Sequence, residues 1–573
     1  AIANLVTGTT VGIIGATGVR NGDLYFSYAI PFDAATLNIS GGANPAAVTI
    51  TSAPAIVTVN STGTVANTVT TLRLGGVATA LVINAEADLS IGAITGLNGT
   101  TASITIAGSA PNAGPGVAPG ISLGVLSTNV GQVTASGLTS TGITTVIGAN
   151  PALNLTGGAG ADLILVGAGQ GAAITGVING GAGTSDVIAF ATGADLAAGS
   201  AAKFVGFETL SVGNFGAAST LQAYDVSLFS PVAIYGIGGF GGVNTGSIQL
   251  NNLPTAQPVS VYSNVSGTNA AGGLSLRIAD ASGAADAITL QLDNLNATTA
   301  PNVSGVTVSG LALGGNATAG QIETLNIVSA GKVTGTGTAN AVSLVNSGAS
   351  PNFADPNTIK VTGSQALSLT LGTLVHGVTV DASADTGGIS FSSLAGATGA
   401  PFIVTVNGST VNDTIQIGAT QTTTVVGGTG GDAILIGLAT RAVTIAYKAA
   451  AESLMDLTGT SGLGGTGKMD TISGFVSGLD KIRLNDIAPA FNAPQIIVDG
   501  GQAASAADAA ILLSNPSFFM DATNTVRKVA QFDYIDGTML VADTNANGIY
   551  DSGDLVVYLL GVTNVVNSDL VGS

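Results

Sequence analysis

A nine-residue pattern, G-G-x-G-x-D-x-U-x with U a large apolar residue, occurs at residues 157–165 and again at residues 427–435. Glycine tolerates positive φ, so such a turn can direct backbone carbonyls inward, and the Asp adds a carboxylate to them. Calcium takes about 6–8 oxygen ligands of these kinds at about 2.3–2.6 Å. The pattern therefore indicates calcium ions held between successive turns of a coiled β chain.

Three imperfect copies extend this pattern. Residues 180–188 and 464–472 carry one inserted residue before the Asp, and Asp413 with Ile415 forms a worn copy about two nonapeptides before Asp432. A short roll of this kind has little core, so bound ions would supply much of its folding free energy. The alternative is a glycine-rich hairpin that binds no metal.

A second candidate cation site is the segment 543–554, which follows a D-x-N-x-N-G loop with an acid at position 12. In such loops the Asp and Asn side chains are ligands, and the Gly makes a sharp turn. The segment departs from the usual loop because position 12 is Asp rather than Glu and no helix is expected beside it. A plain Asx-rich turn is the alternative.

Together these patterns predict a set of calcium ligands and turn glycines. They are Gly158, Gly160, Asp162, Gly181, Gly183, Asp186, Asp413, Gly428, Gly430, Asp432, Gly465, Gly467, Asp470, Asp480, Asp543, Asn545, Asn547, Asp551 and Asp554.

The elements that must position these residues are predicted to be short strands. Residues 35–40, 47–51, 56–60 and 102–107 alternate apolar with small polar residues, which is the period of a half-buried strand. Glycine and asparagine turns separate them. A sandwich, a parallel solenoid and an irregular β-helix remain open for residues 1–150. One helix is expected at about residues 503–513, where Ala and Leu dominate.

Changes in composition divide the chain into five segments. Residues 1–150 and 216–400 are expected to be strand-repeat domains, 151–215 and 401–485 calcium-binding rolls, and 486–573 a C-terminal cap. The phrases at 207–212 and 322–327 echo each other as a strand opened by an acid. They suggest two copies of one building unit, with chance similarity as the alternative.

The charge of the chain is unusual in kind. Only 8% of residues are charged, against about 25% in typical proteins, and the net charge is −19. Glu occurs only at positions 86, 208, 323 and 452, so nearly all the acids are Asp, the residue of turns and of calcium sites. Without a basic patch, a nucleic-acid partner is not expected.

The sequence gives no sign of catalysis or of a membrane span. There is no Cys, so no disulfide or thiolate site is available, and no apolar run approaches about 18 residues. The single histidine, His376, is expected in a strand without a nucleophile beside it. The start at Ala1, without Met or a signal sequence, indicates a processed or excised chain.

The glycine-aspartate nonapeptides resemble those of the RTX family of secreted calcium-binding proteins. The stretch 469–484, with Asp470 and Asp480, is similar to the phrase that follows RTX rolls, and 543–554 resembles a later part of the same region. This resemblance implies an all-β, elongated, multi-domain fold of β-solenoid or β-roll and sandwich-like segments, with few short helices. It also implies calcium as the cofactor and type I secretion directed by the C-terminus.

Low charge, absence of Cys and dispersed RTX-like turns further resemble the surface-layer proteins of Gram-negative bacteria. That resemblance implies an extracellular, non-catalytic protein that assembles with itself into a calcium-dependent lattice. A segment outside this chain would bind the cell-surface polysaccharide. An RTX adhesin or filament subunit, and the non-catalytic part of a larger secreted protein, are the alternatives.

Overall fold

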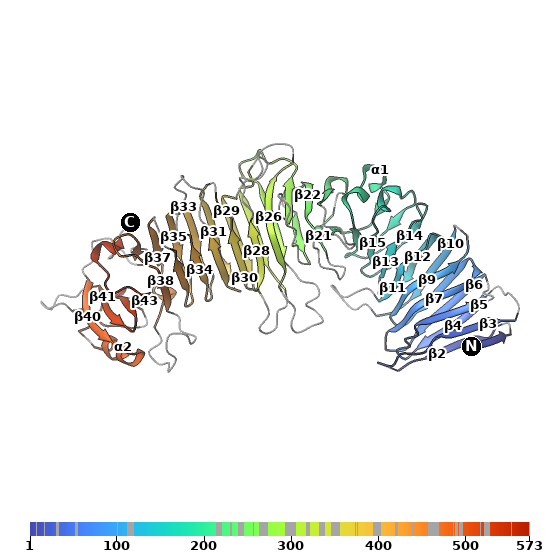
Figure 1. Ribbon diagram of the computed structural model, residues 1–573, viewed down its shortest axis with the longest axis horizontal. Helices are drawn as coiled ribbons and strands as arrows, with labels where there is room; N and C mark the ends of the chain where they lie inside the picture. Colours follow the sequence, from blue (N-terminus) through green and yellow to red (C-terminus); the bar gives the residue numbers. More distant parts are fainter. Residues whose placement is uncertain are drawn as a thin grey trace. The chain divides into compact units, whose positions relative to one another are not determined.

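The computed structural model (Figure 1) describes residues 1–573 except 7, 17, 30–33, 52–54, 100, 112–119, 214–220, 230–231, 239–245, 256, 263–272, 293–304, 317–320, 332–338, 345–355, 373, 375, 394–402, 419–421, 438–440, 456–468, 485, 488–490, 492–496, 516, 521–527, 552 and 572–573. The chain forms two compact units, an N-terminal unit (Ala1–Asn264 with Thr298–Ala300) and a C-terminal unit (Val265–Ala297 with Pro301–Ser573).

Strands that alternate along the N-terminal unit belong to two different parallel sheets. The odd strands are β1 (Ile2–Leu5), β3 (Leu24–Tyr28), β5 (Ala47–Thr51), β7 (Asn67–Ala78), β9 (Leu89–Leu97), β11 (Ile121–Val125), β13 (Ile143–Ile147), β15 (Leu163–Val166), β17 (Val187–Phe190), β19 (Thr209–Val212), β21 (Ile234–Ile237) and β23 (Pro258–Val261). The even strands are β2 (Thr10–Ile14), β4 (Ala34–Ser40), β6 (Ile56–Thr62), β8 (Ala80–Ala85), β10 (Ala102–Gly108), β12 (Val130–Leu138), β14 (Asn154–Thr156), β16 (Ile178–Asn179) and β18 (Phe204–Val205). The next two even strands, β20 (Gln222–Asp225) and β22 (Ile248–Leu253), pair with each other in a separate sheet. Each coil contributes one strand to each sheet, which is a β-solenoid. The short helix α1 (Ala198–Ala201) and the 3-10 turns η1 (Gly171–Ala173), η2 (Gly193–Asp195) and η3 (Val226–Leu228) lie between strands.

The C-terminal unit repeats this arrangement. Its odd strands are β25 (Ala287–Leu292), β27 (Thr324–Ser329), β29 (Thr358–Gly363), β31 (Val378–Asp385), β33 (Ile403–Asn407), β35 (Thr422–Val426), β37 (Val443–Ala446), β39 (Lys481–Arg483) and β44 (Leu570–Val571). Its even strands are β24 (Leu274–Ile278), β26 (Thr307–Gly315), β28 (Asn340–Leu344), β30 (Leu367–Leu371), β32 (Ile389–Ser393), β34 (Thr414–Ile417), β36 (Ala433–Ile436) and β38 (Asp470–Ser473). The even sheet continues through β43 (Leu555–Leu560), β42 (Gly537–Ala542), β41 (Val529–Tyr534) and β40 (Ile497–Ala503), with β41, β42 and β43 antiparallel. The helix α2 (Ala506–Leu513) and the turns η6 (Ala450–Glu452) and η8 (Asn567–Asp569) complete the unit.

The core of the solenoid is a column of aliphatic side chains, because every second residue of a strand points inward. In the N-terminal unit, Val57, Leu81 and Ile104 stack in register through three coils, and each is fully buried. The C-terminal end has a different core. There α2 and the antiparallel strands enclose an aromatic cluster that includes Phe519, Phe532 and Tyr558. Few aromatic residues are needed because the space between two flat sheets is thin.

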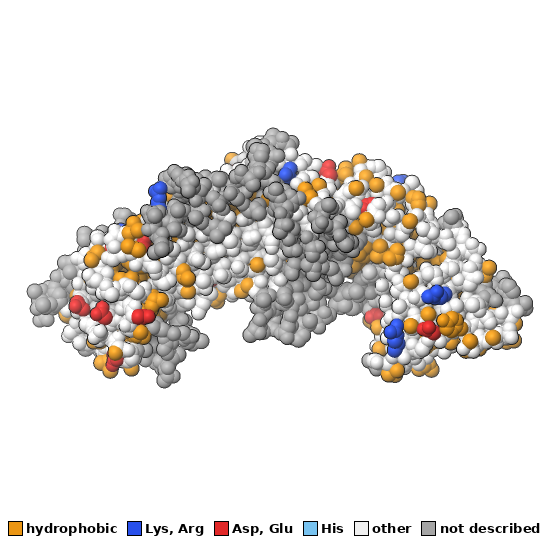
Figure 2. Space-filling view, in the orientation of Figure 1, with side chains coloured by type: hydrophobic (Ala, Val, Ile, Leu, Met, Phe, Trp, Pro, Cys, Tyr) orange, Lys and Arg blue, Asp and Glu red, His pale blue; other side chains and the backbone are white. Residues whose placement is uncertain are grey.

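Outward positions carry threonine in register from coil to coil. In the C-terminal unit one row runs through Thr324, Thr358, Thr379, Thr405, Thr424 and Thr444. In the N-terminal unit a row runs through Thr36, Thr58, Val82, Thr105, Thr134 and Thr156. Threonine suits this position because it is β-branched and polar. Figure 2 shows the consequence, a surface of neutral polar and hydrophobic side chains with few charged groups.

The structure confirms the predicted all-β class and, for residues 1–150, selects the parallel solenoid among the three architectures left open. The predicted C-terminal helix exists as α2, although Ala503 belongs to β40. The placement of His376 was wrong, since β31 begins only at Val378 and His376 lies in the bend before it. Within the described ranges, no helix has both the length and the apolarity needed to cross a membrane.

Candidate cation site

The aspartates of the glycine-aspartate turns share one structural position. Asp162 and Asp186 directly precede β15 and β17, Asp413 and Asp432 directly precede β34 and β36, and Asp470 begins β38. All five side chains are buried. Because consecutive coils stack in register, these residues form two columns of carboxylates, one in each unit.

In the C-terminal column, each carboxylate accepts a hydrogen bond from the backbone of the preceding coil. Asp413 Oδ1 accepts from the amide of Ile389 at 2.7 Å, Asp432 Oδ1 from the amide of Asp413 at 2.8 Å, and Asp470 Oδ1 from the amide of Asp432 at 2.9 Å. The carboxylates therefore connect successive coils at the start of each even strand. Asp470 in turn donates its own amide to Ser453 Oγ at 2.8 Å.

The second oxygens differ along this column. Asp413 Oδ2 accepts from the amide of Ser409. The Oδ2 atoms of Asp432 and Asp470 are buried, and no described residue donates a hydrogen bond to either. Both oxygens line the space beside Gly427, where a Cβ would stand 2.3 Å from Asp432 Oδ2 and 3.3 Å from Asp470 Oδ2. Only glycine leaves this space open between the two acids.

Two further groups surround this pair. Glu452, at the end of η6, is buried and accepts from the amide of Lys448 at 2.8 Å through Oε2. Tyr447, which follows β37, is fully buried and faces Asp470, although the described atoms of the two groups make no hydrogen bond of normal geometry. A phenol therefore faces the pair Asp432–Asp470, and a third carboxylate lies near enough for its charge to act on both acids.

Burial controls the protonation of these acids. Desolvation raises the pKa of Asp432 to about 7, with contributions from the charges of Asp413 and Glu452. It raises the pKa of Asp470 well above the usual range, with a contribution from the charge of Asp432. The pKa of Glu452 is also raised by burial. Each acid costs free energy to ionise here, so a proton or a cation must offset the charge.

The N-terminal column has the same connections. Asp162 accepts from the amide of Ile143 at 2.6 Å and from the amide of Gly158 at 2.9 Å, so both its oxygens are used. Asp186 Oδ1 accepts from the amide of Asp162 at 2.8 Å, whereas its buried Oδ2 has no donor within the described ranges. Burial raises the pKa of Asp162 to about 8 and that of Asp186 to about 6. This column therefore presents one unpartnered oxygen rather than two.

The predicted glycines that the structure describes lie in the turns before these aspartates. Gly181 and Gly428 have φ values of 118° and 100°, a region that favours glycine. Gly465 and Gly467 lie outside the described residues. The remaining predicted turn positions are Gly158, Gly160, Gly183 and Gly430.

The residues present fit a calcium ion best at Asp432 and Asp470, because two buried oxygens without donors face one glycine-lined space. Calcium prefers carboxylate, carbonyl and water oxygens. Across the described part of the chain, no three His, Cys, Asp or Glu side chains gather closely enough to enclose a metal by themselves. A bound ion would therefore complete its shell with backbone carbonyls or water.

In the loop 543–554 the carboxylates of the predicted ligands accept hydrogen bonds from within the loop. Asp543 accepts from the amides of Asn547 and Gly548, and Asp554 accepts from those of Thr544 and Asp551. The amide groups of Asn545 and Asn547 donate to the Asp551 carboxylate, which places nitrogen rather than oxygen toward it. A hydrogen bond from the amide of Gly553, together with those from Asn545 and Asn547, lowers the pKa of Asp551. The loop satisfies its own oxygens, as an Asx-rich turn does.

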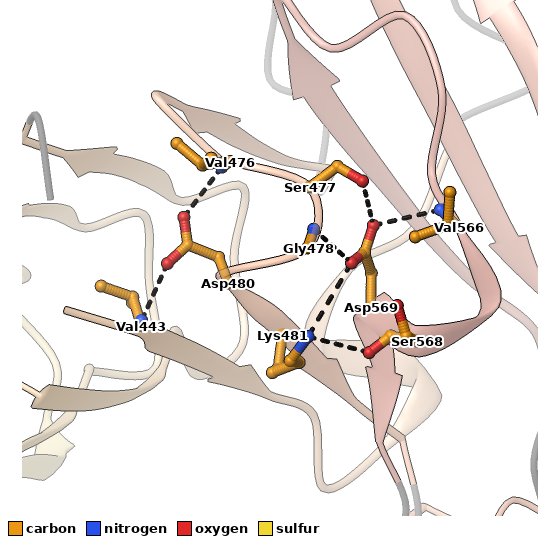
Figure 3. A network of polar contacts seen from close by, with 9 residues as sticks. All are labelled: Val443, Val476, Ser477, Gly478, Asp480, Lys481, Val566, Ser568 and Asp569. Atoms are coloured by element: carbon orange, nitrogen blue, oxygen red, sulfur yellow. Dashed lines mark hydrogen bonds and ion pairs between the residues drawn. The ribbon is translucent and has the colours of Figure 1, made fainter. Parts of the chain in front are cut away.

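Asp480, predicted from the phrase after the roll, is joined by an acid that the sequence analysis missed. Asp480 accepts from the amides of Val443 and Val476, both at 2.8 Å. In the next coil, Asp569 accepts from the amide of Gly478 at 2.7 Å and from Ser477 Oγ at 2.6 Å. Figure 3 shows the two carboxylates directed at these turns. Asp480 thus connects the start of β39 to the start of β37, and Asp569 connects β44 to the turn before β39.

Other missed residues share a simpler signal than the nonapeptide. Glu208 and Glu323, the acids of the two echoing phrases, accept from the amides of Asp186 at 2.9 Å and of Asp286 at 2.7 Å. Both immediately precede strands of an odd sheet, as Asp569 does. An acid two residues before a large aliphatic residue, with or without glycines, marks this position. Glu452 and Tyr447 carry no local signal, because only the coiling brings them to Asp470.

No protein-family model matches this chain, and a comparison with curated proteins finds no match.

Proposed function

We propose that this chain is a non-catalytic structural protein of a bacterial surface layer, in which calcium bound between coils stiffens a self-assembling solenoid. The observation that carries the proposal is the pair of buried Asp432 and Asp470 oxygens, unpartnered among the described atoms, beside Gly427. Its architecture suits a scaffold, because flat stacked coils form a repeating frame, and only 8% of the residues are charged.

The chemistry of the pair explains why a cation matters. Without metal, Asp432 and Asp470 favour their protonated forms, because burial and mutual repulsion oppose ionisation. A calcium ion would replace those protons and link the coil of β36 to that of β38 at the oxygens that lack donors. Calcium would thus hold two coils in register near the C-terminal end of the solenoid. The proposal includes secretion to the cell surface, where calcium is available.

Terbium luminescence tests the ion site directly. Terbium is a calcium-sized ion with the same preference for oxygen, and it emits when a nearby aromatic ring transfers energy to it. The chain has no Trp, so Tyr447 beside Asp470 is the expected donor. We expect saturable emission that calcium displaces and that both Tyr447→Phe and Asp470→Asn abolish. Tyr550→Phe is the matched control, because Tyr550 lies beside Asp551 and Asp554 in the loop.

Emission that survives Tyr447→Phe and disappears in Tyr550→Phe would show that the ion binds at the loop 543–554 instead. Absence of any calcium-displaceable emission would refute the ion site. Electron microscopy of the purified chain with and without millimolar calcium then tests the assembly. Two-dimensional sheets that dissolve on chelation are the expected result, whereas fibres or monomers at saturating calcium would contradict a surface layer.

A further inference from the structure

Asparagine followed by glycine is a dipeptide that loses ammonia spontaneously, and it occurs five times in this chain. Glycine has no Cβ, so its backbone nitrogen can reach the carbonyl carbon of the asparagine side chain and close a cyclic imide. For this reaction the nitrogen must be free of other bonds, and the peptide must be free to turn. The pairs are Asn21–Gly22, Asn98–Gly99, Asn179–Gly180, Asn407–Gly408 and Asn547–Gly548.

At three of these pairs an acceptor already holds the glycine nitrogen. The amide of Gly180 donates to the carbonyl of Val205 at 2.9 Å, that of Gly408 to the carbonyl of Val426 at 2.8 Å, and that of Gly548 to Asp543 Oδ2 at 2.8 Å. The first two bonds join neighbouring coils of the solenoid, so closing the imide there requires the coil to open locally. The fold therefore protects these three asparagines.

Asn21 is held in a different way. Its Oδ1 accepts a hydrogen bond from the amide of Asn44 at 2.7 Å, and its own amide donates to the carbonyl of Asn44 at 3.1 Å. Rotation of the Asn21 side chain toward the nitrogen of Gly22 would break the first of these bonds. The side-chain carbonyl that the reaction needs is thus already engaged.

Asn98, which directly follows β9, has none of these restraints. Its side chain is exposed, and no described residue makes a hydrogen bond to that side chain or to the amide of Gly99. Gly99 is exposed as well, with φ 86°, and a Cβ there would meet no atom within 4 Å. The backbone before it is fixed, because the amide of Asn98 donates to the carbonyl of Ala78 at 2.8 Å. The peptide between Asn98 and Gly99 is therefore open to rotation and to water.

We propose that Asn98 is a site of spontaneous deamidation. The Gly99 nitrogen loses its proton to hydroxide and attacks the side-chain carbonyl carbon of Asn98, and the side-chain nitrogen leaves as ammonia. Water then opens the imide at either carbonyl, which gives aspartate or isoaspartate. Each event consumes water, releases ammonia and adds a negative charge to a chain of net charge −19. The reaction needs neither a cation nor assembly, so it is independent of the proposed function.

The products change the surface more than the fold. The backbone amide of residue 98, which bonds to the carbonyl of Ala78, is present in both products, so the end of β9 stays in place. A carboxylate is added in the connection between β9 and β10. In a chain of which only 8% of the residues are charged, this carboxylate is a lasting mark of the time that the protein has spent in water.

The test incubates the full chain at mildly alkaline pH, folded and in denaturant, and follows each pair by mass spectrometry of proteolytic peptides. In the folded chain we expect Asn98 to react at least about tenfold faster than Asn179 or Asn407, because a hydrogen bond that must break first lowers the rate by about that factor. In denaturant the pairs should react at similar rates, since they share the same dipeptide. The rate at Asn98 should rise with hydroxide concentration.

Asn98→Gln is the matched variant, because glutamine keeps the amide but closes its larger ring slowly. On ion exchange the folded variant should stay a single species, whereas the unaltered chain should convert into a more acidic one. Asn98→Asp marks the position of that species and should leave the melting temperature unchanged. Earlier reaction at Asn21, equal rates at Asn98 and Asn407 in the folded chain, or no product at Asn98 would each overturn the proposal. A lead of Asn98 that persists in denaturant would overturn it too, because local sequence rather than the fold would then select the site.

Discussion

Asn67 in the N-terminal unit and Asp470 in the C-terminal unit use buried side chains for the same task. Asn67 Oδ1 accepts from the amide of Ala43 at 3.0 Å, and Asp470 Oδ1 accepts from the amide of Asp432 at 2.9 Å, so each connects two coils. Their second atoms differ. Asn67 Nδ2 donates to Ser61 Oγ at 3.0 Å, whereas Asp470 Oδ2 receives no hydrogen bond from the described residues.

The difference shows how one backbone geometry supports two kinds of stability. An amide has both a donor and an acceptor, so it can complete its hydrogen bonds without any ion or proton. A carboxylate has only acceptors and carries a charge, so burial leaves it dependent on a proton or a cation. Asn340 makes the neutral connection within the C-terminal unit, through Val306 and Ser329. Neutral amide connections therefore occur in both units, and whether an amide or an acid connects two coils differs from coil to coil.

The largest expected effect comes from replacing the buried amide of Asn67 by a carboxylate. Asn67→Asp would turn an oxygen toward the carbonyls of Ile39 and Thr62, which now accept from Nδ2. We expect a loss of about 3 kcal/mol, the cost of an unpaired buried charge or of the repulsion that replaces the bonds. Thermal unfolding of metal-free protein measures it.

The control is Asn84→Asp, because Asn84 is exposed and makes a single side-chain bond to Asn60 at 2.8 Å. Its expected cost is below about 1 kcal/mol. Equal losses of unfolding free energy in the two variants would show that Asn67 does not make a buried polar connection between coils.

The reverse substitution should have the opposite sign. In metal-free protein, Asp470→Asn keeps the acceptor for the amide of Asp432 and adds a donor beside Asp432 Oδ2. We expect a gain of about 1–2 kcal/mol, because a buried repulsion is replaced by a hydrogen bond. The calcium-dependent rise in melting temperature should disappear. A destabilised variant that still responds to calcium would show that the ion does not bind at Asp470.

Changing pH tests the same charge without substitution. The folded pKa values of Asp432 (about 7) and Asp162 (about 8) lie above the value of about 3.9 expected in an unfolded chain. Between these limits the folded protein binds more protons, so its stability falls as pH rises from about 4 to 8. We expect metal-free protein to melt about 5 °C lower at pH 8 than at pH 5. Calcium should reduce that difference, because it binds the ionised carboxylates; a flat profile would contradict the buried charges.

The sequence predicted much of the fold because its signal repeats. Strands such as β5 and β10 alternate apolar and polar residues, and that alternation is the inward and outward alternation of a solenoid. It could not separate a solenoid from a sandwich at 1–150, because both bury every second residue. The parallel register, such as Ile104 beside Leu81, depends on contacts between coils that no single strand encodes.

For the site, the nonapeptide located the aspartates that begin the strands, and the structure places them in columns. Proximity across coils was beyond the sequence, so Glu452 and Tyr447 were missed. For the loop 543–554, which stays a prediction, the sequence also left the neighbours of each oxygen open. Its spelling matches a calcium loop, yet its amide groups and backbone N–H groups already satisfy Asp543 and Asp551. Whether an oxygen is free depends on the three-dimensional neighbours of the residue.

The smallest expected effect concerns the acids of the two echoing phrases. Glu208 and Glu323 are half-buried, and each accepts one backbone amide through Oε2, so the oxygen rather than the charge is needed. We expect Glu208→Gln and Glu323→Gln to change stability by less than about 0.5 kcal/mol, whereas Glu208→Ala should cost about 1 kcal/mol by leaving the amide of Asp186 without its acceptor. Hydrogen exchange at the amide of Asp186 measures this directly: protection should persist in the Gln variant and fall in the Ala variant. If Gln and Ala prove equally damaging, the charge itself matters, and Glu208 belongs with Asp186 in a second cation site of the N-terminal column.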